Sequence, residues 1–400
     1  MPAAPAPIRL AYLLSQYPAV NHVFMLREVR LLRTLGFEIH VASIRDPDRP
    51  LAQMTAAERE EVAATYYVKS SGLRVVASAH LHTLVTRPVS YCRGLTEALR
   101  VGISAAPYFA EAVVIGRWMA AHKISHLHTH FASTVATMVA RVFPVTFSMT
   151  VHGPAEFQDP IKSRLARKVE ASLFVCAISQ FGLSQIMYAN EHAQWGKLER
   201  TMLGVDPSEF VPRPFRPNPE PFEIICVGRL AAVKGQHLLI EAIDALASQG
   251  RRVRLRLAGD GPDRGELEED VRRRGIFGEV VFEGNVNQDR LKDLYRGSDV
   301  LVLSSFAEGL PVVLMEAMAM EIPCIAPWVN GIPEIITHGV DGLLVPPGSG
   351  QALTCAIARL IDDAELRRAL GESARRKIVD KFNAQRNIEQ LAEIFRRRLS

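Results

Sequence analysis

The most constraining feature of the sequence is a repeated alternation of short apolar runs with longer amphipathic stretches. In the first half, an apolar run at Ile8–Leu14 precedes a helical pattern at Phe24–Leu35, and a second apolar run follows at Glu38–Ile44. Runs of this length predict buried strands, and the intervening pattern predicts helices. Because strands that alternate with helices form parallel sheets covered on both faces, we expect an α/β chain with doubly wound, Rossmann-like sheets.

A proline-rich segment divides the chain. Six prolines between Asp206 and Pro221 exclude a regular helix or a central strand there. After it the alternation restarts, with strands predicted at Phe222–Val227, Val253–Ala258, Val280–Phe282, Val300–Leu303 and Cys324–Ala326, and helices at Gln236–Ser248, Arg264–Arg274, Asp289–Arg296 and Val312–Met320. We therefore expect two similar domains that face a central cleft, at 1–207 and 222–380, with a linker at 208–221 and a C-terminal helix at 381–400 that crosses back to the first domain.

Composition and charge exclude several classes of protein. The 400 residues are 48% apolar and 22% charged, which is typical of a globular protein with two domains. A net charge of +4 gives no reason to expect a nucleic-acid partner. The chain has neither a signal-like start nor an apolar run long enough to span a membrane, and its five cysteines form no C-x-x-C pair. We expect a cytoplasmic protein with reduced core thiols.

The first half carries the positive excess. Residues 1–210 contain 21 Lys and Arg against 16 Asp and Glu. A helical pattern at Arg74–Ala121 places several arginines among apolar side chains. Such a surface predicts peripheral contact with an anionic membrane face. The alternative is an ordinary solvated helix face on which arginine stems cover apolar surface.

Two segments of the second half predict an anion site. In one, a strand leads through a loop with Glu308 into a helix that starts near Pro311, so several backbone N–H groups are open to a ligand. Glu316 lies inside that helix, roughly 10 Å from Glu308 at 1.5 Å per residue, which is too far for a glycosidase pair. In the other, Arg229 and Lys234 follow a strand and form a diphosphate clamp when combined with the helix start. Alone, they would be read as solvent-exposed charges.

These motifs resemble those of glycosyltransferase family 4, which is retaining and has the two-domain GT-B fold. The E-x7-E pattern of that family matches Glu308–Glu316, its G-R-L-x4-K-G pattern matches Gly228–Gly235, and its A-G-D-G-P turn matches Ala258–Pro262. Further matches lie at Gly204–Asp206, Glu283–Val286, Asn330–Glu334 and Asp341–Val345. The loop at Ser15–Phe24 lacks a Gly-Gly pair and is closer to the exopolysaccharide, colanic-acid-type subgroup.

The resemblance implies a nucleotide-sugar site in the second domain. Arg229 and Lys234 would hold the diphosphate, and Glu316 the ribose hydroxyls. Glu308 would hold the transferred sugar, together with the backbone from Gly309 to Val312. The implied donor-binding set is Gly228, Arg229, Lys234, Gly284, Val286, Glu308, Gly309, Leu310, Pro311, Val312 and Glu316, with Val286 beside the base.

In the first domain, the resemblance implies that His152 approaches the reacting centre, so the catalytic set is His152, Arg229, Lys234 and Glu308. A structural, hydrogen-bonded histidine is the alternative for His152. Asn21 and His22 are implied acceptor contacts.

The function implied is transfer of a hexose, with retention, from a nucleotide diphosphate sugar to a lipid-linked or oligosaccharide acceptor in cell-surface polysaccharide or glycolipid biosynthesis. The family generally works without a metal, so no metal or other cofactor is expected. A sugar-nucleotide 2-epimerase of the same fold is the alternative, although those enzymes lack the G-R-L-x4-K-G loop. The choice between UDP and GDP, the sugar, the linkage and the oligomeric state stay open.

Two patterns superficially suggest metal ligands. His126, His128 and His130 share one face of a predicted strand. No carboxylate or cysteine adjoins that run in the sequence, so we do not predict a metal site there. Asp46-Pro47-Asp48 is formally a D-x-D pattern, and we expect a solvated turn.

Overall fold

The computed structural model describes residues 7–102, 105–153, 156–157 and 163–400, with the exception of the Asn21 side chain. The chain divides into two compact units. Unit 1 comprises Met1–Ile178, Gly182–Thr201 and Ile388–Ser400, and unit 2 comprises Ser179–Phe181 and Met202–Asn387. The proline-rich segment therefore groups with unit 2, while the last helix begins in unit 2 and continues in unit 1.

The first sheet has seven parallel strands in the order β3-β2-β1-β4-β5-β6-β7. Their bounds are β1 (Arg9–Gln16), β2 (Glu38–Arg45), β3 (Tyr66–Tyr67), β4 (His126–His130), β5 (Thr146–Val151), β6 (Phe174–Ala177) and β7 (Leu198–Arg200). The chain order reverses between β1 and β4. In open parallel sheets, ligands bind outside the carboxyl ends of the strands at such a reversal.

Helices cover both faces of this sheet. They are α1 (Val23–Thr34), α2 (Ala56–Ala64), α3 (Leu73–Thr86), α4 (Pro88–Val101), α5 (Ala106–Ala121), α6 (Ser133–Val142), α9 (Leu165–Ala171), α10 (Gln180–Tyr188) and α18 (Ala384–Leu399). Alternate residues of β1 serve two apolar clusters, with Leu13 in one and Tyr12 in the other, as a period of two requires. Leu391 and Phe395 of α18 join the Tyr12 cluster, which explains why the end of the chain belongs to unit 1.

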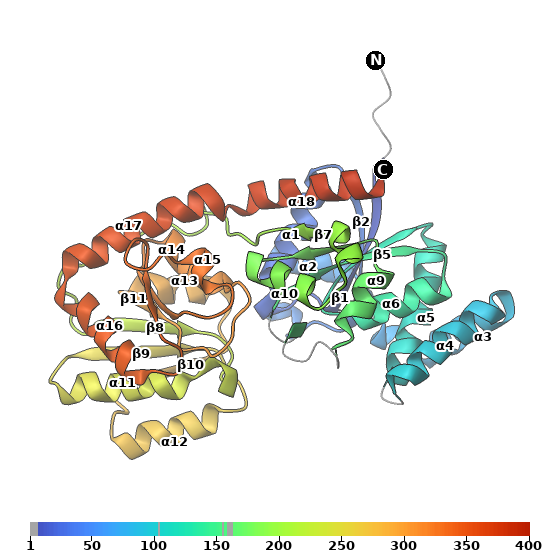
Figure 1. The fold of residues 1–400 in the computed structure, drawn as a ribbon. Coiled ribbons are helices and arrows are strands. Elements are labelled where there is room, and N and C mark those ends of the chain that lie inside the picture. Colours follow the sequence, from blue (N-terminus) through green and yellow to red (C-terminus); the bar gives the residue numbers. More distant parts are fainter. Residues whose placement is uncertain (1–6, 103–104, 154–155, 158–162) are drawn as a thin grey trace. The chain divides into compact units, whose positions relative to one another are not determined.

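The second sheet has six parallel strands in the order β10-β9-β8-β11-β12-β13. Their bounds are β8 (Phe222–Val227), β9 (Val253–Ala258), β10 (Val280–Gly284), β11 (Val300–Val302), β12 (Cys324–Pro327) and β13 (Leu343–Val345). The helices are α11 (Gln236–Ser248), α12 (Arg264–Arg274), α13 (Gln288–Gly297), α14 (Val312–Ala319), α15 (Ile332–Ile335), α16 (Gly350–Asp362) and α17 (Ala364–Lys381). Helices α11 and α12 lie on the same side of the sheet, beside β9 and β10 (Figure 1).

The doubly wound α/β prediction is confirmed in both units. The predicted helical stretch at Arg74–Ala121 is three helices, because Pro88 starts α4 and Gly102 ends it with φ of +124°. Helices α3 and α4 run side by side (Figure 1). No helix in the described part of the chain has the length and apolar character that a bilayer crossing requires.

The prediction of core thiols holds for three cysteines only. Cys176, Cys226 and Cys324 are buried, whereas Cys92 and Cys355 are exposed. Cys92 lies on the exposed face of α4, and Cys355 on that of α16, so an apolar neighbour in the sequence does not guarantee burial on a helix.

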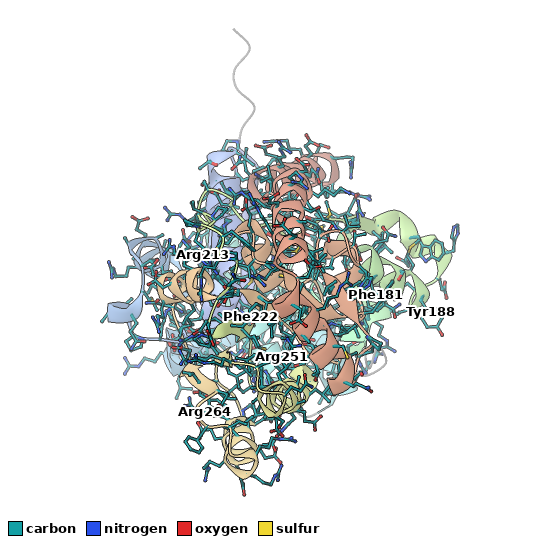
Figure 2. The ribbon with its side chains drawn as sticks, turned by 90° about the vertical axis from the view of Figure 1, so that its left-hand side faces the viewer. Phe181, Tyr188, Arg213, Phe222, Arg251 and Arg264 are labelled. Carbon is teal, nitrogen blue, oxygen red and sulfur yellow. The ribbon has the colours of Figure 1, made fainter. Side chains whose placement is uncertain are left out.

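The proline-rich segment is fastened to unit 2 by two arginines. Arg367 lies over the rings of Phe215 and Phe222, at 5.2 and 5.3 Å from their centroids, and donates to the carbonyl oxygens of Arg216 and Pro217. Arg213 forms a 2.7 Å ion pair with Asp299. Figure 2 labels Arg213, in the middle of this segment, and Phe222, which directly follows it. These contacts fix the start of β8, the strand that leads into the candidate site.

Candidate active site

The loop after β8 is shaped by close backbone packing against the turn after β9. The N–H of Gly228 donates to the carbonyl of Ala258 at 3.0 Å, and the N–H of Leu230 donates to that of Asp260 at 3.1 Å. A Cβ atom at residue 259 would lie 2.1 Å from the carbonyl oxygen of Gly228, so only glycine fits there. This packing fixes the path of the loop that carries Arg229 and Lys234.

Lys234 and Glu308 form the centre of the candidate site. The Lys234 ammonium donates to Oε1 of Glu308 at 2.6 Å, and the hydroxyl of Ser305 donates to the same oxygen at 2.6 Å. Glu308 is buried, while the lysine side chain is 27% exposed. The two loops are also joined by a backbone hydrogen bond from Phe306 to Val233. The structure thus brings these two predicted residues together at the carboxyl ends of β8 and β11.

Arg229 provides a second cation on the same loop. Its side chain is exposed, and no group in the described ranges is recorded as a partner of its guanidinium. The carbonyl of Arg229 accepts a 2.9 Å hydrogen bond from the amide of Gln236, which holds the backbone at the start of α11. An exposed arginine on a fixed backbone is available to an anionic ligand.

The loop before α14 is held from the side by residues 330 and 331. The Asn330 side-chain oxygen accepts from the N–H of Glu308 at 3.4 Å. A Cβ atom at residue 331 would lie 2.2 Å from the carbonyl oxygen of Gly309, which explains the glycine in the Asn330–Glu334 motif. Pro311 is the N-cap residue of α14, and its side chain caps none of the N–H groups of the first turn. Leu310 and Pro311 themselves are buried.

Glu316 is more enclosed than Glu308. Its side chain, on α14, is almost fully buried, and its Oε2 accepts a 2.8 Å hydrogen bond from the hydroxyl of Tyr295. Burial and the nearby Glu316 carboxylate raise the pKa of Tyr295. Sequence reasoning missed Tyr295, because it lies 21 residues before Glu316 on another helix, α13.

Gly284 and Val286 lie on the neighbouring strand end. The carbonyl of Gly284, the last residue of β10, accepts from the N–H of Gly259 at 2.9 Å. Gly259 therefore contacts both Gly228 and Gly284, which joins two predicted donor-binding positions through one turn. Val286 follows in a half-buried position.

In unit 1, His152 belongs to a buried chain of hydrogen bonds. Its Nε2 lies 2.7 Å from Nδ1 of His130, and Nε2 of His130 lies 3.1 Å from Oε1 of Glu28. Tyr12 donates to the same carboxylate oxygen at 2.9 Å. Burial, with the neighbouring His130, lowers the pKa of His152, which is therefore neutral at pH 7. In the tautomer in which Nε2 of a neutral His130 donates to the carboxylate, His152 donates to Nδ1 of His130, and Nδ1 of His152 is left as an acceptor.

The other histidines of β4 pair with hydroxyls on β5. The register places His126 opposite Thr146 and His128 opposite Ser148, and both ring nitrogens of each histidine lie within 3.0 Å of a hydroxyl on β5. No carboxylate adjoins these histidines in the sequence, but the folded chain places one beside them. Glu28 on α1 lies within hydrogen-bond distance of His130. Glu28, His128 and His130 each place one ligand atom within 4.8 Å of the others. A metal there would have to displace buried hydrogen bonds of His128.

The predicted acceptor contacts lie in η1 (Val20–His22). The side chain of Asn21 lies outside the described residues. His22 stacks on Phe131, with ring centroids 4.8 Å apart, and burial lowers its pKa to about 4.

The two carboxylates of the exposed D-x-D segment, those of Asp46 and Asp48, accept hydrogen bonds from other parts of unit 1. Asp48 accepts from the N–H of Val20 at 2.7 Å, and Asp46 accepts from the hydroxyl of Ser70. The expectation of a solvated turn is thus corrected, since the segment anchors the loop that carries η1.

Comparisons with known proteins bear on both units. Residues 208–377 match the family model for glycosyl transferases, group 1. The solved structure of Anabaena HepE in complex with UDP and glucose aligns with a TM-score of 0.74 at 18% identity, covering 97% of this chain and 99% of that one. The chain has the GT-B fold.

Two curated relatives extend the comparison. The putative colanic acid biosynthesis glycosyltransferase WcaL of Escherichia coli is 26% identical over 414 residues, covering 97% of this chain and 99% of WcaL. The alpha-D-kanosaminyltransferase of Streptomyces kanamyceticus is 35% identical over 173 residues, covering 43% of this chain and 45% of that enzyme. For several curated relatives, the match spans about half of their length or less. The family model and these relatives agree on one enzyme class, the glycosyltransferases.

Proposed function

We propose that the chain is a retaining glycosyltransferase of family 4. It would move a hexose from a nucleoside diphosphate sugar to a lipid-linked or oligosaccharide acceptor in the assembly of a cell-surface polysaccharide. The observation that carries the proposal is the pairing of Lys234 with Glu308 at the carboxyl ends of β8 and β11. Beside this pair lie the exposed Arg229 and the uncapped start of α14. Two cations and a helix N-terminus suit a departing diphosphate.

The geometry supports a specific sequence of contacts. The diphosphate of the donor would compete with Glu308 for the Lys234 ammonium, and the released carboxylate would accept hydrogen bonds from hydroxyls of the sugar. As the bond from the anomeric carbon to the phosphate oxygen breaks, charge develops on the diphosphate beside Arg229 and Lys234. The acceptor oxygen bonds to the anomeric carbon on the same face, and its proton passes to the departing phosphate oxygen. This route retains configuration and requires neither a protein nucleophile nor a metal.

The donor is tested first with uridine nucleotides, because the HepE structure holds UDP. The experiment titrates the full chain with UDP and with GDP by calorimetry, and then incubates it with a panel of nucleotide hexoses. We expect one of the two nucleoside diphosphates to bind. We also expect the chain to cleave one nucleotide hexose of the panel and to produce that same nucleoside diphosphate. Absence of binding to both nucleotides would contradict the proposal.

The same incubation separates transfer from epimerisation. The matching family model describes glycosyl transferases, and the two relatives are named as glycosyltransferases. Their names favour transfer of the sugar over its epimerisation. A donor kept without an acceptor should yield at most the free sugar and the nucleoside diphosphate. Recovery of an epimerised nucleotide sugar, read by NMR, would support the 2-epimerase instead. With an acceptor present, the anomeric coupling of the product reports retention.

A lipid-linked acceptor is supported by a surface on α3 and α4. Its exposed apolar residues are Leu73, Val75, Leu81, Leu84, Val85, Val89, Leu95 and Leu99. Leu73 is 88% exposed and Val85 is 71% exposed. Arg74, Arg93 and Arg100 are exposed on the same two helices, and Arg87 is exposed between them. The two helices contain a single acidic residue, Glu97. Apolar side chains beside basic ones match the interface of an anionic bilayer. We therefore propose peripheral attachment at the cytoplasmic membrane face through this α3–α4 surface.

Sedimentation with vesicles tests this attachment. The chain should bind vesicles that contain phosphatidylglycerol, less at high salt, and neutral vesicles weakly. A Leu81→Ser, Val85→Ser double variant should lose binding. Phe277→Ser and Val340→Ser, which alter exposed apolar residues of unit 2, are the matched controls. Equal binding of all variants to the vesicles would contradict membrane attachment through the α3–α4 surface.

A further inference from the structure

Unit 1 contains a cavity of about 510 Å³ at the carboxyl edge of its sheet. Its wall includes Ser15 at the end of β1, Arg45 at the end of β2 and Phe131 directly after β4. The cavity therefore lies at the reversal of strand order between β1 and β4, where open parallel sheets bind ligands. The first residues of α6 also line it, and the N-cap residue Ala132 offers them no side-chain acceptor. Their N–H groups are thus available to an anion.

Three cations line the same cavity, together with the carboxyl groups of Glu111 and Glu156. Arg45, Lys69 and Lys168 come from three separate elements of unit 1. The only hydrogen bond recorded for the Arg45 guanidinium within the described residues is a 3.4 Å contact with the carbonyl of Ser15. In the same part of the chain, no carboxylate lies at ion-pair distance from any of the three. Burial lowers the pKa of Lys168, while the neighbouring Glu156 acts in the opposite direction.

Glu111 is an independent indication of a ligand. It lines the cavity from α5 with a relative exposure of 8%, and its Oε2 has no hydrogen-bond partner within the described residues. Burial raises its pKa, while Lys69 and Arg45 act in the opposite direction. A buried carboxyl oxygen without a partner is costly unless a bound molecule supplies one. Hydroxyl groups of a sugar are suitable donors.

Aromatic rings connect the cavity to His152. Phe131 has φ of +60° although it is not glycine, and its ring lies between those of His22 and His152, at 4.8 and 4.5 Å. Such backbone conformations persist where the surroundings impose them, often at ligand sites. Phe131 and Tyr108 are each about 40% exposed and line the cavity, so they offer ring faces to the apolar side of a sugar. A ligand in the cavity thus contacts the ring that packs on His152.

We propose that this cavity binds the acceptor through an anionic group, a phosphate or a carboxylate, held by Arg45, Lys69, Lys168 and the start of α6. The hydroxyls of the same ligand meet Glu111, and its ring meets Phe131. The acceptor is therefore an acidic or phosphorylated sugar rather than a neutral one. This inference rests on the proposed transferase function, because it assigns the second substrate of that reaction.

Three sugars that differ only at carbon 6 test the inference. D-glucose 6-phosphate, D-glucuronate and D-glucose are titrated into the full chain by calorimetry, with and without saturating UDP to occupy the nucleotide site. At least one of the two anions should bind at least tenfold more tightly than glucose. The anion that binds identifies phosphate or carboxylate as the recognised group. Lys69→Gln and Arg45→Gln, measured separately, should each weaken that binding about tenfold while the affinity for UDP is retained.

Lys123→Gln is the matched control, because Lys123 is an exposed lysine of unit 1 outside the cavity. Its affinities should equal those of the unaltered chain, and melting temperatures verify that every variant is folded. Equal affinity for the three sugars, or anion binding that survives both substitutions, overturns the inference. Failure of both UDP and GDP to bind contradicts the proposed function instead, since the sugar titrations without a nucleotide do not depend on it.

Discussion

The two units have similar parallel sheets but different polar interiors. In unit 1, His126 and His128 meet serine and threonine hydroxyls between β4 and β5, and burial lowers the pKa of both histidines, that of His126 to about 3. In unit 2, Arg256 lies between Glu223 and Glu283, at 3.0 and 2.7 Å. Burial opposes ionisation of Glu283, but hydrogen bonds from Arg256 and Arg290 lower its pKa.

The difference shows that one topology supports two kinds of polar contact. Neutral imidazoles tolerate deep burial because they carry no charge to desolvate. Between β8, β9 and β10 of unit 2, ion pairs take the place of these imidazole contacts, and their shared Arg256 stays partly exposed. The following predictions test this difference between the two sheets, in order of decreasing expected effect.

Acid should weaken unit 1 before unit 2. His126, His128 and His152 have lowered pKa values in the folded chain, so between pH 6.5 and their folded values the unfolded state binds more protons. The free energy of unfolding therefore falls as the pH drops below about 6.5, by roughly 2 kcal/mol per buried histidine at pH 5. This corresponds to about a thirtyfold loss of protection of the backbone amides from hydrogen exchange. Glu283 has a lowered pKa, so its contribution to unit 2 is lost only below about pH 4.5.

Hydrogen exchange at pH 7 and pH 5 measures this difference, after correction for the intrinsic exchange rate. Peptides from β4 and β5 should lose protection, while those from β8 and β9 should keep it. Equal losses in both units would contradict the assignment of neutral buried histidines.

The two glutamates of the candidate site should differ in their kinetic roles. Glu308→Gln should act mainly on kcat, because it weakens contact with the ring that is transferred. Glu316→Gln should mainly weaken donor binding, because that carboxylate would hold the ribose in the ground and transition states alike. At about 1.5 to 3 kcal/mol per charged hydrogen bond, each loss should be at least tenfold.

Full kinetics on both variants, with nucleotide affinity measured separately, distinguish these roles. Glu269→Gln, on an exposed position of α12, is the control. If Glu308→Gln lost nucleotide affinity while Glu316→Gln lost only kcat, the donor would lie in the opposite direction along α14.

Chelation should have the smallest effect. Two cations and a helix start would supply the positive charge that a metal provides elsewhere, so EDTA should leave turnover within about twofold. Turnover that disappears with EDTA and returns with a divalent ion would direct attention to Glu28, His128 and His130.

Local signals in the sequence were sufficient for most of unit 2. The bounds of β8, α11, β9 and α12 agree with the predicted ones, because each of these elements is bordered on at least one side by Gly or Pro. Lys234 and Glu308 were also predicted as neighbours in one site, since both follow strands of a parallel sheet. The short strand β13 was missed, because three apolar residues carry too weak a pattern.

Contacts between distant residues were not predictable in the same way. Glu28 lies 102 residues before His130, and nothing local connects them. Tyr295 and Glu316 are joined only because α13 and α14 pack on the same sheet. The cavity at Arg45, Lys69 and Lys168 likewise combines separate elements, and only the folded chain brings these three cations together. Motif spacing predicts a site when one loop carries it, and fails when several elements contribute one side chain each.

The central claim is that unit 2 holds the diphosphate of the donor through Lys234 and Arg229, and calorimetry with UDP tests it most directly. The unaltered chain, Lys234→Gln, Arg229→Gln and the exposed control Lys381→Gln are titrated under identical salt and pH. Each substitution at the site should weaken binding about tenfold or more, in keeping with the loss of a charged hydrogen bond, and the control should match the unaltered chain. UDP affinity that is unchanged in both site variants would contradict the claim.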